Sequence, residues 1–97
     1  MLVLQDCIKK LKQFKTAFGK QFGITKIGIF GSVARKENTD DSDIDIVVEV
    51  QKPTLTLMYE LREGLKALFG CEVDLVRFRD SLRPLLKSNI QKDVIYV

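Results

Sequence analysis

Residues 24–50, ITKIGIFGSVARKENTDDSDIDIVVEV, contain the pattern from which the fold is predicted. An apolar segment that ends at Phe30 runs directly into Gly31-Ser32, and after ten intervening residues a second apolar segment begins with Asp43-Ile44-Asp45. Aspartate is a poor strand former and is rarely buried without a partner. Acids at the start of a segment of isoleucine and valine therefore indicate a chemical role.

This stretch predicts two strands joined by a short helix and a polar turn. The first strand is expected over residues 24–30, and residues 32–35 are expected to form the first turn of a helix, with Ser32 near its N-cap. Side chains alternate along a strand, so the second strand presents two different faces. Its apolar face is expected to consist of Ile44, Ile46, Val48 and Val50. Its opposite face is expected to carry Asp43, Asp45, Val47 and Glu49.

The flanking segments predict three further helices and a third strand. Apolar residues at helical spacing indicate an amphipathic helix over roughly residues 3–21, and a second one after Pro53 that Gly70 can close. The third strand is expected over residues 71–78 and the last helix after residues 80–81. Because a helix connects the second strand to the third, we expect these strands to be parallel neighbours.

The last helix and the C-terminal tail complete the predicted elements. The inward-facing residues of this helix are expected to be Leu82, Leu85, Leu86 and Ile90. Residues 93–97 are apolar and are compatible with a helix end, a short edge strand or a contact with a partner.

The composition indicates one small domain, residues 1–97, and excludes several catalytic chemistries. The chain is 45% hydrophobic and 30% charged, as in an ordinary globular protein. Its net charge of +3, from 16 basic and 13 acidic residues, does not favour nucleic acid, and we expect no direct nucleic-acid binding. There is no histidine, which excludes histidine general bases, Ser-His-Asp triads and most zinc sites.

The cysteines and the N-terminus predict a cytoplasmic location without a membrane partner. Cys7 and Cys71 lie in separate apolar patterns, so we expect buried small side chains in a reducing compartment rather than a disulfide. The N-terminus lacks a basic region followed by a sustained apolar one. No run approaches the roughly 18–20 apolar residues that a bilayer span needs.

Three aspartates are expected to converge on divalent cations. Asp43 and Asp45 are two residues apart and share a strand face, and Asp74 joins them if the third strand pairs with the second. Carboxylates this close repel one another, and a hard cation such as Mg²⁺ resolves the conflict. Two such ions about 3.5–4 Å apart would bind the attacking and leaving oxygens of a phosphoryl displacement.

The Gly31-Ser32 turn is expected to hold a phosphate chain. Glycine allows a triphosphate to approach the backbone, and the N–H groups that follow it, with the Ser32 hydroxyl, would face the anion. Arg35 is expected either to contact phosphate or to pin the acidic loop. Hydrogen-bond donors that can hold a phosphate chain, placed beside metal ligands, favour nucleotidyl transfer.

Each of these features also has an ordinary structural explanation. Ser32 could serve only as a helix cap, and Asp74 could be a strand-end carboxylate paired with a basic residue. Glu37 is close enough in sequence to contribute indirectly to the site. Glu72 is assigned to the strand face opposite Asp74, where a salt bridge is its favoured role. Only the combination of the Gly31-Ser32 turn, the pair Asp43 and Asp45, and Asp74 is specific for nucleotidyl transfer.

Three segments together resemble the minimal nucleotidyltransferases of the polymerase-beta-like superfamily: residues 31–35, 42–48 and 73–76. The resemblance covers essentially the whole chain and implies an α/β fold in the order αβαβαβα, with a small mixed sheet flanked by helices. It implies that Asp43 and Asp45 are metal ligands and that Asp74 is the third acid, which helps to activate the attacking hydroxyl. It also implies that Gly31-Ser32 grips the triphosphate.

The resemblance extends to a partner protein. Members of this family are often antitoxins whose partner is an all-helical HEPN ribonuclease. The implied activity is transfer of AMP from ATP to a tyrosine of that partner, together with stable binding to it. One departure is that the family often has glycine after the arginine, whereas this chain has Lys36. This change alters the freedom of the loop or adds a cation near the phosphates.

Three functions follow from these observations. The leading one is a Mg²⁺-dependent nucleotidyltransferase that adenylylates a hydroxyl of a protein partner. The second is an antitoxin that neutralises its partner by binding alone, with residues 94–97 in the interface. The third is a small-molecule nucleotidyltransferase, similar to those that modify aminoglycosides, which usually carry an extra substrate domain. The motifs are compatible with ATP, GTP, CTP or UTP and with a homo- or hetero-oligomer.

Overall fold

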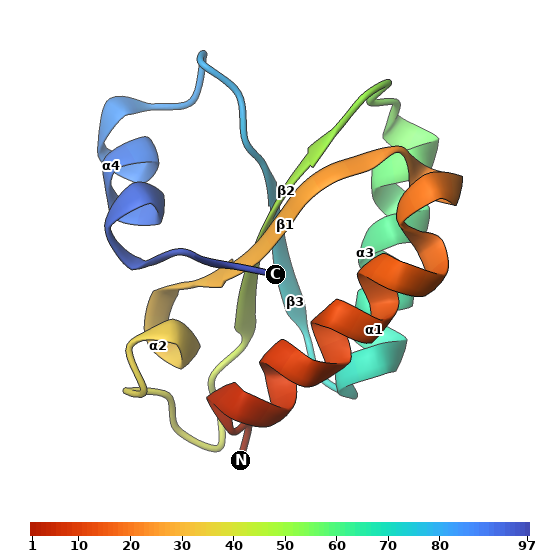
Figure 1. Cartoon of the computed structure of the whole chain (residues 1–97). Coiled ribbons are helices and arrows are strands. Elements are labelled where there is room, and N and C mark those ends of the chain that lie inside the picture. The colour runs from red at the N-terminus through yellow and green to blue at the C-terminus, as the bar shows by residue number, and fades with distance from the viewer.

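The structure, a computed structural model, describes residues 1–97 as a four-stranded sheet with helices on both faces (Figure 1). The strands are β1 (Ile24–Phe30), β2 (Ile44–Val50), β3 (Val73–Arg77) and β4 (Ile95–Tyr96). Their order in the sheet is β3-β2-β1-β4. Strand β1 is antiparallel to both β2 and β4, whereas β2 and β3 are parallel. The predicted mixed sheet and the predicted parallel pair are confirmed.

Four helices accompany the sheet, and their bounds lie close to the predicted ones. They are α1 (Leu4–Phe22), α2 (Gly31–Ala34), α3 (Leu55–Phe69) and α4 (Pro84–Asp93). Helices α1 and α3 cover one face of the sheet, and α4 lies on the opposite face (Figure 1). The short helix α2 follows the end of β1 directly. The sheet is therefore enclosed between helices on both sides over much of its area.

Two apolar clusters bury side chains on both faces of β2, one of the two inner strands of the sheet. Under α1 and α3, the side chains of Ile44, Ile46 and Val48 are fully buried, as predicted. On the opposite face, Val47 packs with Ile90 and other residues beneath α4. Burial of each such side chain stabilises the fold by about 1.5–3 kcal/mol. The central strand is thus held firmly from both sides.

The inward face predicted for the last helix is partly wrong. Ile90 is buried, but the side chain of Leu85 is 75% exposed. Leu86 and Ile90 are four residues apart and lie on the same side of α4, whereas Leu85 is rotated away from that side. Leu82, although buried, belongs to the loop before the helix.

The C-terminal tail forms an edge strand, one of the three alternatives that the sequence allowed. Strand β4 pairs with β1 at Gly28 and Ile29. Ile95 and Val97 pack against the cluster under α1 and α3, and the Nζ of Lys15 donates a hydrogen bond to the Val97 carbonyl at 2.8 Å. The aliphatic side chains of the tail are half-buried against the core, whereas Tyr96 is 41% exposed, and the place of residues 94–97 in a partner interface stays a prediction.

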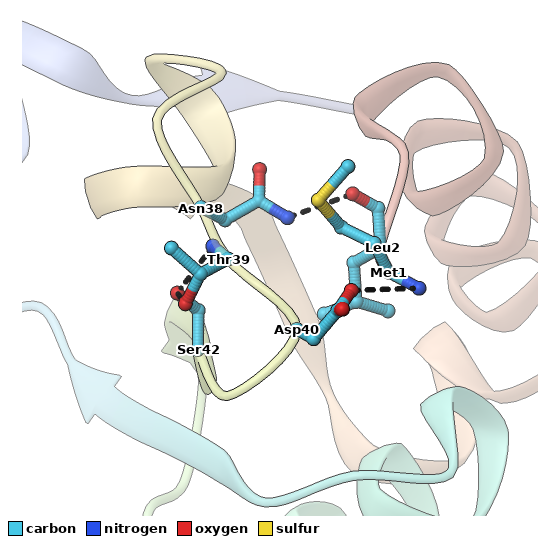
Figure 2. Close-up of polar contacts among 6 residues, drawn as sticks. All are labelled: Met1, Leu2, Asn38, Thr39, Asp40 and Ser42. Atoms are coloured by element: carbon cyan, nitrogen blue, oxygen red, sulfur yellow. Dashed lines mark hydrogen bonds and ion pairs between the residues drawn. The ribbon is translucent and has the colours of Figure 1, made fainter.

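The loop at residues 36–43, which leads into the acidic motif, is tied to the N-terminal segment (Figure 2). The side-chain amide of Asn38 donates a hydrogen bond to the Leu2 carbonyl at 2.8 Å. Within the loop, the backbone N–H of Thr39 donates to the Ser42 hydroxyl at 2.8 Å. These bonds shape the turn immediately before β2.

Both cysteines are free, as predicted. Cys7 is buried and Cys71 is half-buried, and burial raises the pKa of both thiols. None of the helices has the length and hydropathy that crossing a membrane would require.

Gly28→Ala is expected to lower the free energy of unfolding by about 1–3 kcal/mol. An added Cβ would lie 2.7 Å from the carbonyl oxygen of Ile95, so β4 would have to move away from β1. Denaturant titration measures the difference. Gly19→Ala is the matched control: its Cβ would meet only the side chain of Lys15, at 3.7 Å, and the change should stabilise α1 by about 0.5–1 kcal/mol. Equal stability of Gly28→Ala and wild type would contradict the close packing of β4.

Candidate functional site

Asp45 lies at the centre of the candidate site because of the register of the three longer strands. In the sheet, Asp45 of β2 is paired with Phe30 of β1 on one side and with Asp74 of β3 on the other. Phe30 immediately precedes Gly31, so the glycine turn lies beside the acids. The register brings together the turn and two of the three predicted aspartates.

A pocket of about 340 Å³ contains all three predicted aspartates. Asp43 and Asp74 are exposed, whereas Asp45 is half-buried. The residues that line the pocket are Asp43, Asp45, Arg62, Glu72, Val73, Asp74 and Leu75. The structure therefore gathers acids from two separate segments, as the sequence predicts.

The electrostatics of the site are concentrated on Asp45. Burial, followed by the neighbouring carboxylates of Asp74 and Asp43, raises the pKa of Asp45 from 3.8 to about 6. The positive charge of Arg35 acts in the opposite direction. A carboxylate that resists ionisation among like charges is one that a bound cation would stabilise in its charged form.

The chemistry of the pocket suits Mg²⁺, although the aspartates do not form a ready-made cage. Their oxygens are the ligand type that Mg²⁺ prefers. No three acidic, cysteine or histidine side chains are gathered closely enough to enclose one ion. Mg²⁺ commonly binds through one or two carboxylates and completes its shell with water and substrate phosphates. Asp45 and Asp74, which are paired across β2 and β3, can supply two such carboxylates. Their role as metal ligands stays a prediction.

Gly31 is required by the close approach of Asp45. Its φ is 73°, in the left-handed region that disfavours residues with a side chain. A Cβ at this position would also overlap the Asp45 carboxylate. The sequence predicted that glycine allows a phosphate to approach the backbone. In the structure, the space that a side chain at Gly31 would fill is occupied by the Asp45 carboxylate.

Ser32 lies near the N-terminus of α2, as predicted, but its side chain does not cap the helix. Helix α2 begins at Gly31, so Phe30 occupies the N-cap position and no side chain caps the helix. The strand runs straight into the helix, which leaves Ser32 as the second helical residue. Its hydroxyl is therefore not committed to the helix end.

Arg35 binds two carboxylates, of which only Glu37 belongs to the loop that Arg35 was expected to pin. Its Nε lies 3.1 Å from Glu37 and its Nη1 lies 2.5 Å from Asp93 at the end of α4. Glu37 pairs with Arg35 at an exposed position and does not line the pocket of the aspartates. Asp93 was not anticipated, because nothing in the local sequence links it to residue 35.

The assignment of Glu72 to the face opposite Asp74 is wrong, because residues two apart in a strand share a face. Glu72 lines the pocket with Asp74, and its carboxylate forms the expected salt bridge, 3.5 Å from the Nζ of Lys66 in α3. Arg62, also in α3, lines the pocket and was missed. Its spacing of four residues from Lys66 was the only signal in the sequence, because it places both basic residues on one helix face.

The backbone at Lys36 explains why the resemblance leads one to expect glycine there. Its φ is 60°, a left-handed conformation that costs a residue with a side chain about 1–2 kcal/mol. Lys36 nevertheless keeps this path, and its N–H donates to the Val33 carbonyl at 3.1 Å. Its side chain lines a different pocket, with residues 1–5. Glycine would adopt this conformation without that cost.

Comparison with known sequences identifies close relatives. Residues 11–97 match the family described as nucleotidyltransferase domain. The chain is 39% identical over 98 residues to the protein adenylyltransferase MntA of Thermococcus cleftensis. The alignment covers 100% of this chain and 98% of that protein. The similarity thus extends over the full length of both chains.

Comparison with solved structures gives the same result for the fold. A structure described as a minimal nucleotidyltransferase has a TM-score of 0.80 and 28% identity, over 97% of this chain and 95% of that one. A crystal structure of a toxin–antitoxin with AMP-PNP has a TM-score of 0.69 and 25% identity, over 98% of this chain and 72% of that one. The predicted fold class is confirmed.

In the metal-free protein, Asp45→Asn is expected to increase stability at pH 7.5 but not at pH 4. Asp45 ionises near 3.8 when unfolded and at about 6 when folded, so wild-type stability falls as the pH rises through this window. The shift corresponds to about 3 kcal/mol, which solvent screening at this half-exposed site reduces to about 1–2 kcal/mol. Denaturant titrations in EDTA at both pH values measure the gain.

Asp41→Asn serves as the control for this experiment, because it removes a carboxylate from an exposed position just before the same strand. It should give no comparable gain at pH 7.5. An equal gain from both substitutions would attribute the effect to net charge and contradict the local origin in the pocket.

Proposed function

Because this chain belongs to the nucleotidyltransferase family, we propose that it transfers AMP from ATP to a hydroxyl group of a protein. The observation that carries the proposal is the convergence of Asp43, Asp45 and Asp74 beside the Gly31 turn. The full-length similarity to a protein adenylyltransferase supports AMP as the transferred group. The related toxin–antitoxin structure with AMP-PNP supports ATP as the donor.

The proposed reaction is a displacement at the α-phosphorus of ATP. The acceptor oxygen forms a new bond to this phosphorus, the bond from the phosphorus to the bridging oxygen breaks, and pyrophosphate leaves. Asp74 accepts the proton of the acceptor hydroxyl as it attacks. Gly31, Ser32 and the backbone N–H groups of α2 hold the triphosphate, assisted by the guanidinium of Arg35.

Asp43, Asp45 and Asp74 would hold Mg²⁺, in the two-ion arrangement that such a displacement favours. When bound, Mg²⁺ supplies positive charge that neutralises the phosphate oxygens. The raised pKa of Asp45 supports this assignment, because it arises from burial and then from the neighbouring carboxylates of Asp74 and Asp43, and a bound cation would offset both effects. The exposed carboxylates of Asp43 and Asp74 leave room for water and phosphate as the remaining ligands.

We assign the acceptor hydroxyl to a tyrosine of a HEPN-type toxin, with this chain as a single-domain antitoxin. The motif resemblance implies this acceptor, and the related toxin–antitoxin structure supports a toxin as the partner. The site itself is consistent with a large acceptor, since Asp43, Asp74 and Arg62 are all exposed at the pocket. A tyrosine side chain on another protein can therefore reach it.

A second function, neutralisation by binding alone, is favoured by one apolar surface. A pocket of about 380 Å³ lies between α1 and α3, and Phe18 beside it is 41% exposed. The lining residues are Phe14, Phe18, Phe22, Gly64, Ala67 and Leu68. A surface pocket lined by apolar side chains, with one phenylalanine exposed beside it, is typical of a protein interface.

Calorimetric titration with ATP, GTP, CTP and UTP, each with and without Mg²⁺, tests the nucleotide site. We expect Mg²⁺-dependent binding of ATP that Asp43→Asn/Asp45→Asn weakens about tenfold or more, because the metal loses its carboxylates. Asp40→Asn/Asp41→Asn is the matched control, since it removes the same charge from the turn before the pocket. Its binding should equal that of the wild type. Absence of Mg²⁺-dependent binding for all four nucleotides would overturn the proposal.

Co-expression with a HEPN-type protein encoded in the neighbouring reading frame tests the transfer. With α-labelled ATP, we expect label on the partner, loss of that label in Asp43→Asn, and loss of protection from toxicity in the same variant. The reason is that Asp43 is expected to bind the metal that the displacement requires. Equal labelling by Asp43→Asn would contradict the assigned site. Full protection without labelling would instead favour neutralisation by binding.

A further inference from the structure

Asp93 is the last residue of α4, a position where an acidic side chain is unfavourable. The C-terminal end of a helix carries a partial negative charge that repels a carboxylate. The side chain of Asp93 is only 11% exposed, so water compensates this repulsion poorly. A nearly buried acid at this end of a helix needs a cationic partner.

That partner is Arg35, which lies 58 residues earlier in the chain. Its Nη1 donates a hydrogen bond to Oδ2 of Asp93 at 2.5 Å. The second carboxylate on Arg35, that of Glu37, is 62% exposed and lies 3.1 Å from Nε. Because exposed ion pairs are weak, Asp93 is the stronger determinant of where the guanidinium lies.

The backbone on each side of this ion pair is anchored near the glycine turn. Strand β4 starts two residues after Asp93 and pairs with β1 through Ile29 and Ile95, just before β1 ends at the turn. Arg35 is the C-cap of α2, and its backbone N–H bonds the carbonyl of Gly31 at 3.1 Å. The ion pair therefore connects the C-terminal segment to the turn that follows β1.

The guanidinium of Arg35 keeps donors for a further ligand. It has five N–H donors, of which Glu37 takes the one on Nε and Asp93 takes one on Nη1. The side chain of Arg35 is 44% exposed, so the remaining donors are accessible.

We propose that Asp93 is a positioning residue that holds Arg35 beside the Gly31 turn, where the remaining guanidinium donors bind the triphosphate of the nucleotide. This inference rests on the proposed nucleotidyl transfer. An arginine already held by a carboxylate binds phosphate without losing further side-chain freedom. Removal of Asp93 should therefore weaken nucleotide binding even though Asp93 itself does not contact the nucleotide.

Calorimetry with Mg²⁺ and ATP tests this role on the full chain. We expect Asp93→Asn and Asp93→Ser to weaken ATP binding about tenfold, and Asp93→Glu, which keeps the charge, to restore most of the affinity. Glu37→Gln is the matched control and should change the affinity about twofold or less, because its ion pair is exposed. Unchanged or tighter ATP binding by Asp93→Asn would overturn the inference.

A double-mutant cycle separates positioning from a general loosening of the fold. Arg35→Ala should weaken ATP binding at least as much as Asp93→Asn, and the double variant should bind no more weakly than Arg35→Ala. Additive losses would show that Asp93 acts independently of Arg35 and would overturn the inference. Adenosine, which has no phosphate, should bind Asp93→Asn and wild type equally. If Asp93→Asn does not fold, Asp93→Ser carries the same test.

Failure of the inference and failure of the proposed function give different results. If wild type binds ATP with Mg²⁺ and Asp93→Asn binds it equally well, only the positioning role is lost. If wild type binds no nucleotide, both are overturned.

Discussion

The register between β1, β2 and β3 is the constraint on which the rest of the structure depends. It pairs Asp45 with Asp74 and places the residue before Gly31 on the other side of Asp45. A shift of one residue would exchange the two faces of β2 and turn the acids into the core. Burial of Ile44, Ile46 and Val48, worth about 1.5–3 kcal/mol each, opposes such a shift. The apolar face of one strand thus determines where its acidic face lies.

Packing energy also keeps the acids together against their mutual repulsion. The pKa of Asp45 is raised to about 6, first by burial and then by this repulsion. A fold optimised only for stability would separate these charges or neutralise them with a basic side chain. Arg62, the basic residue that lines the pocket, is exposed. The remaining negative charge is the feature that suits the pocket to a divalent cation.

The C-terminal segment links the two faces of the sheet to this site. Helix α4 covers the face that carries Val47, and β4 then returns to the edge of β1, as Figure 1 shows. Gly28 permits this close return, and Asp93 at the junction binds Arg35. The last residues of the chain therefore contribute to the geometry of a turn that lies some sixty residues earlier in the sequence.

The sequence by itself determined the helices, the three longer strands and the aspartates of the pocket, because these follow from local patterns: alternation, helical spacing and residues that end elements. The edge strand β4, the exposed Leu85, and the contributions of Arg62 and Asp93 were decided only by the tertiary structure. Each depends on how elements distant in sequence pack against one another. No periodicity within a segment encodes that packing, so the Arg35–Asp93 pair could be found only once the sheet had brought its two ends together.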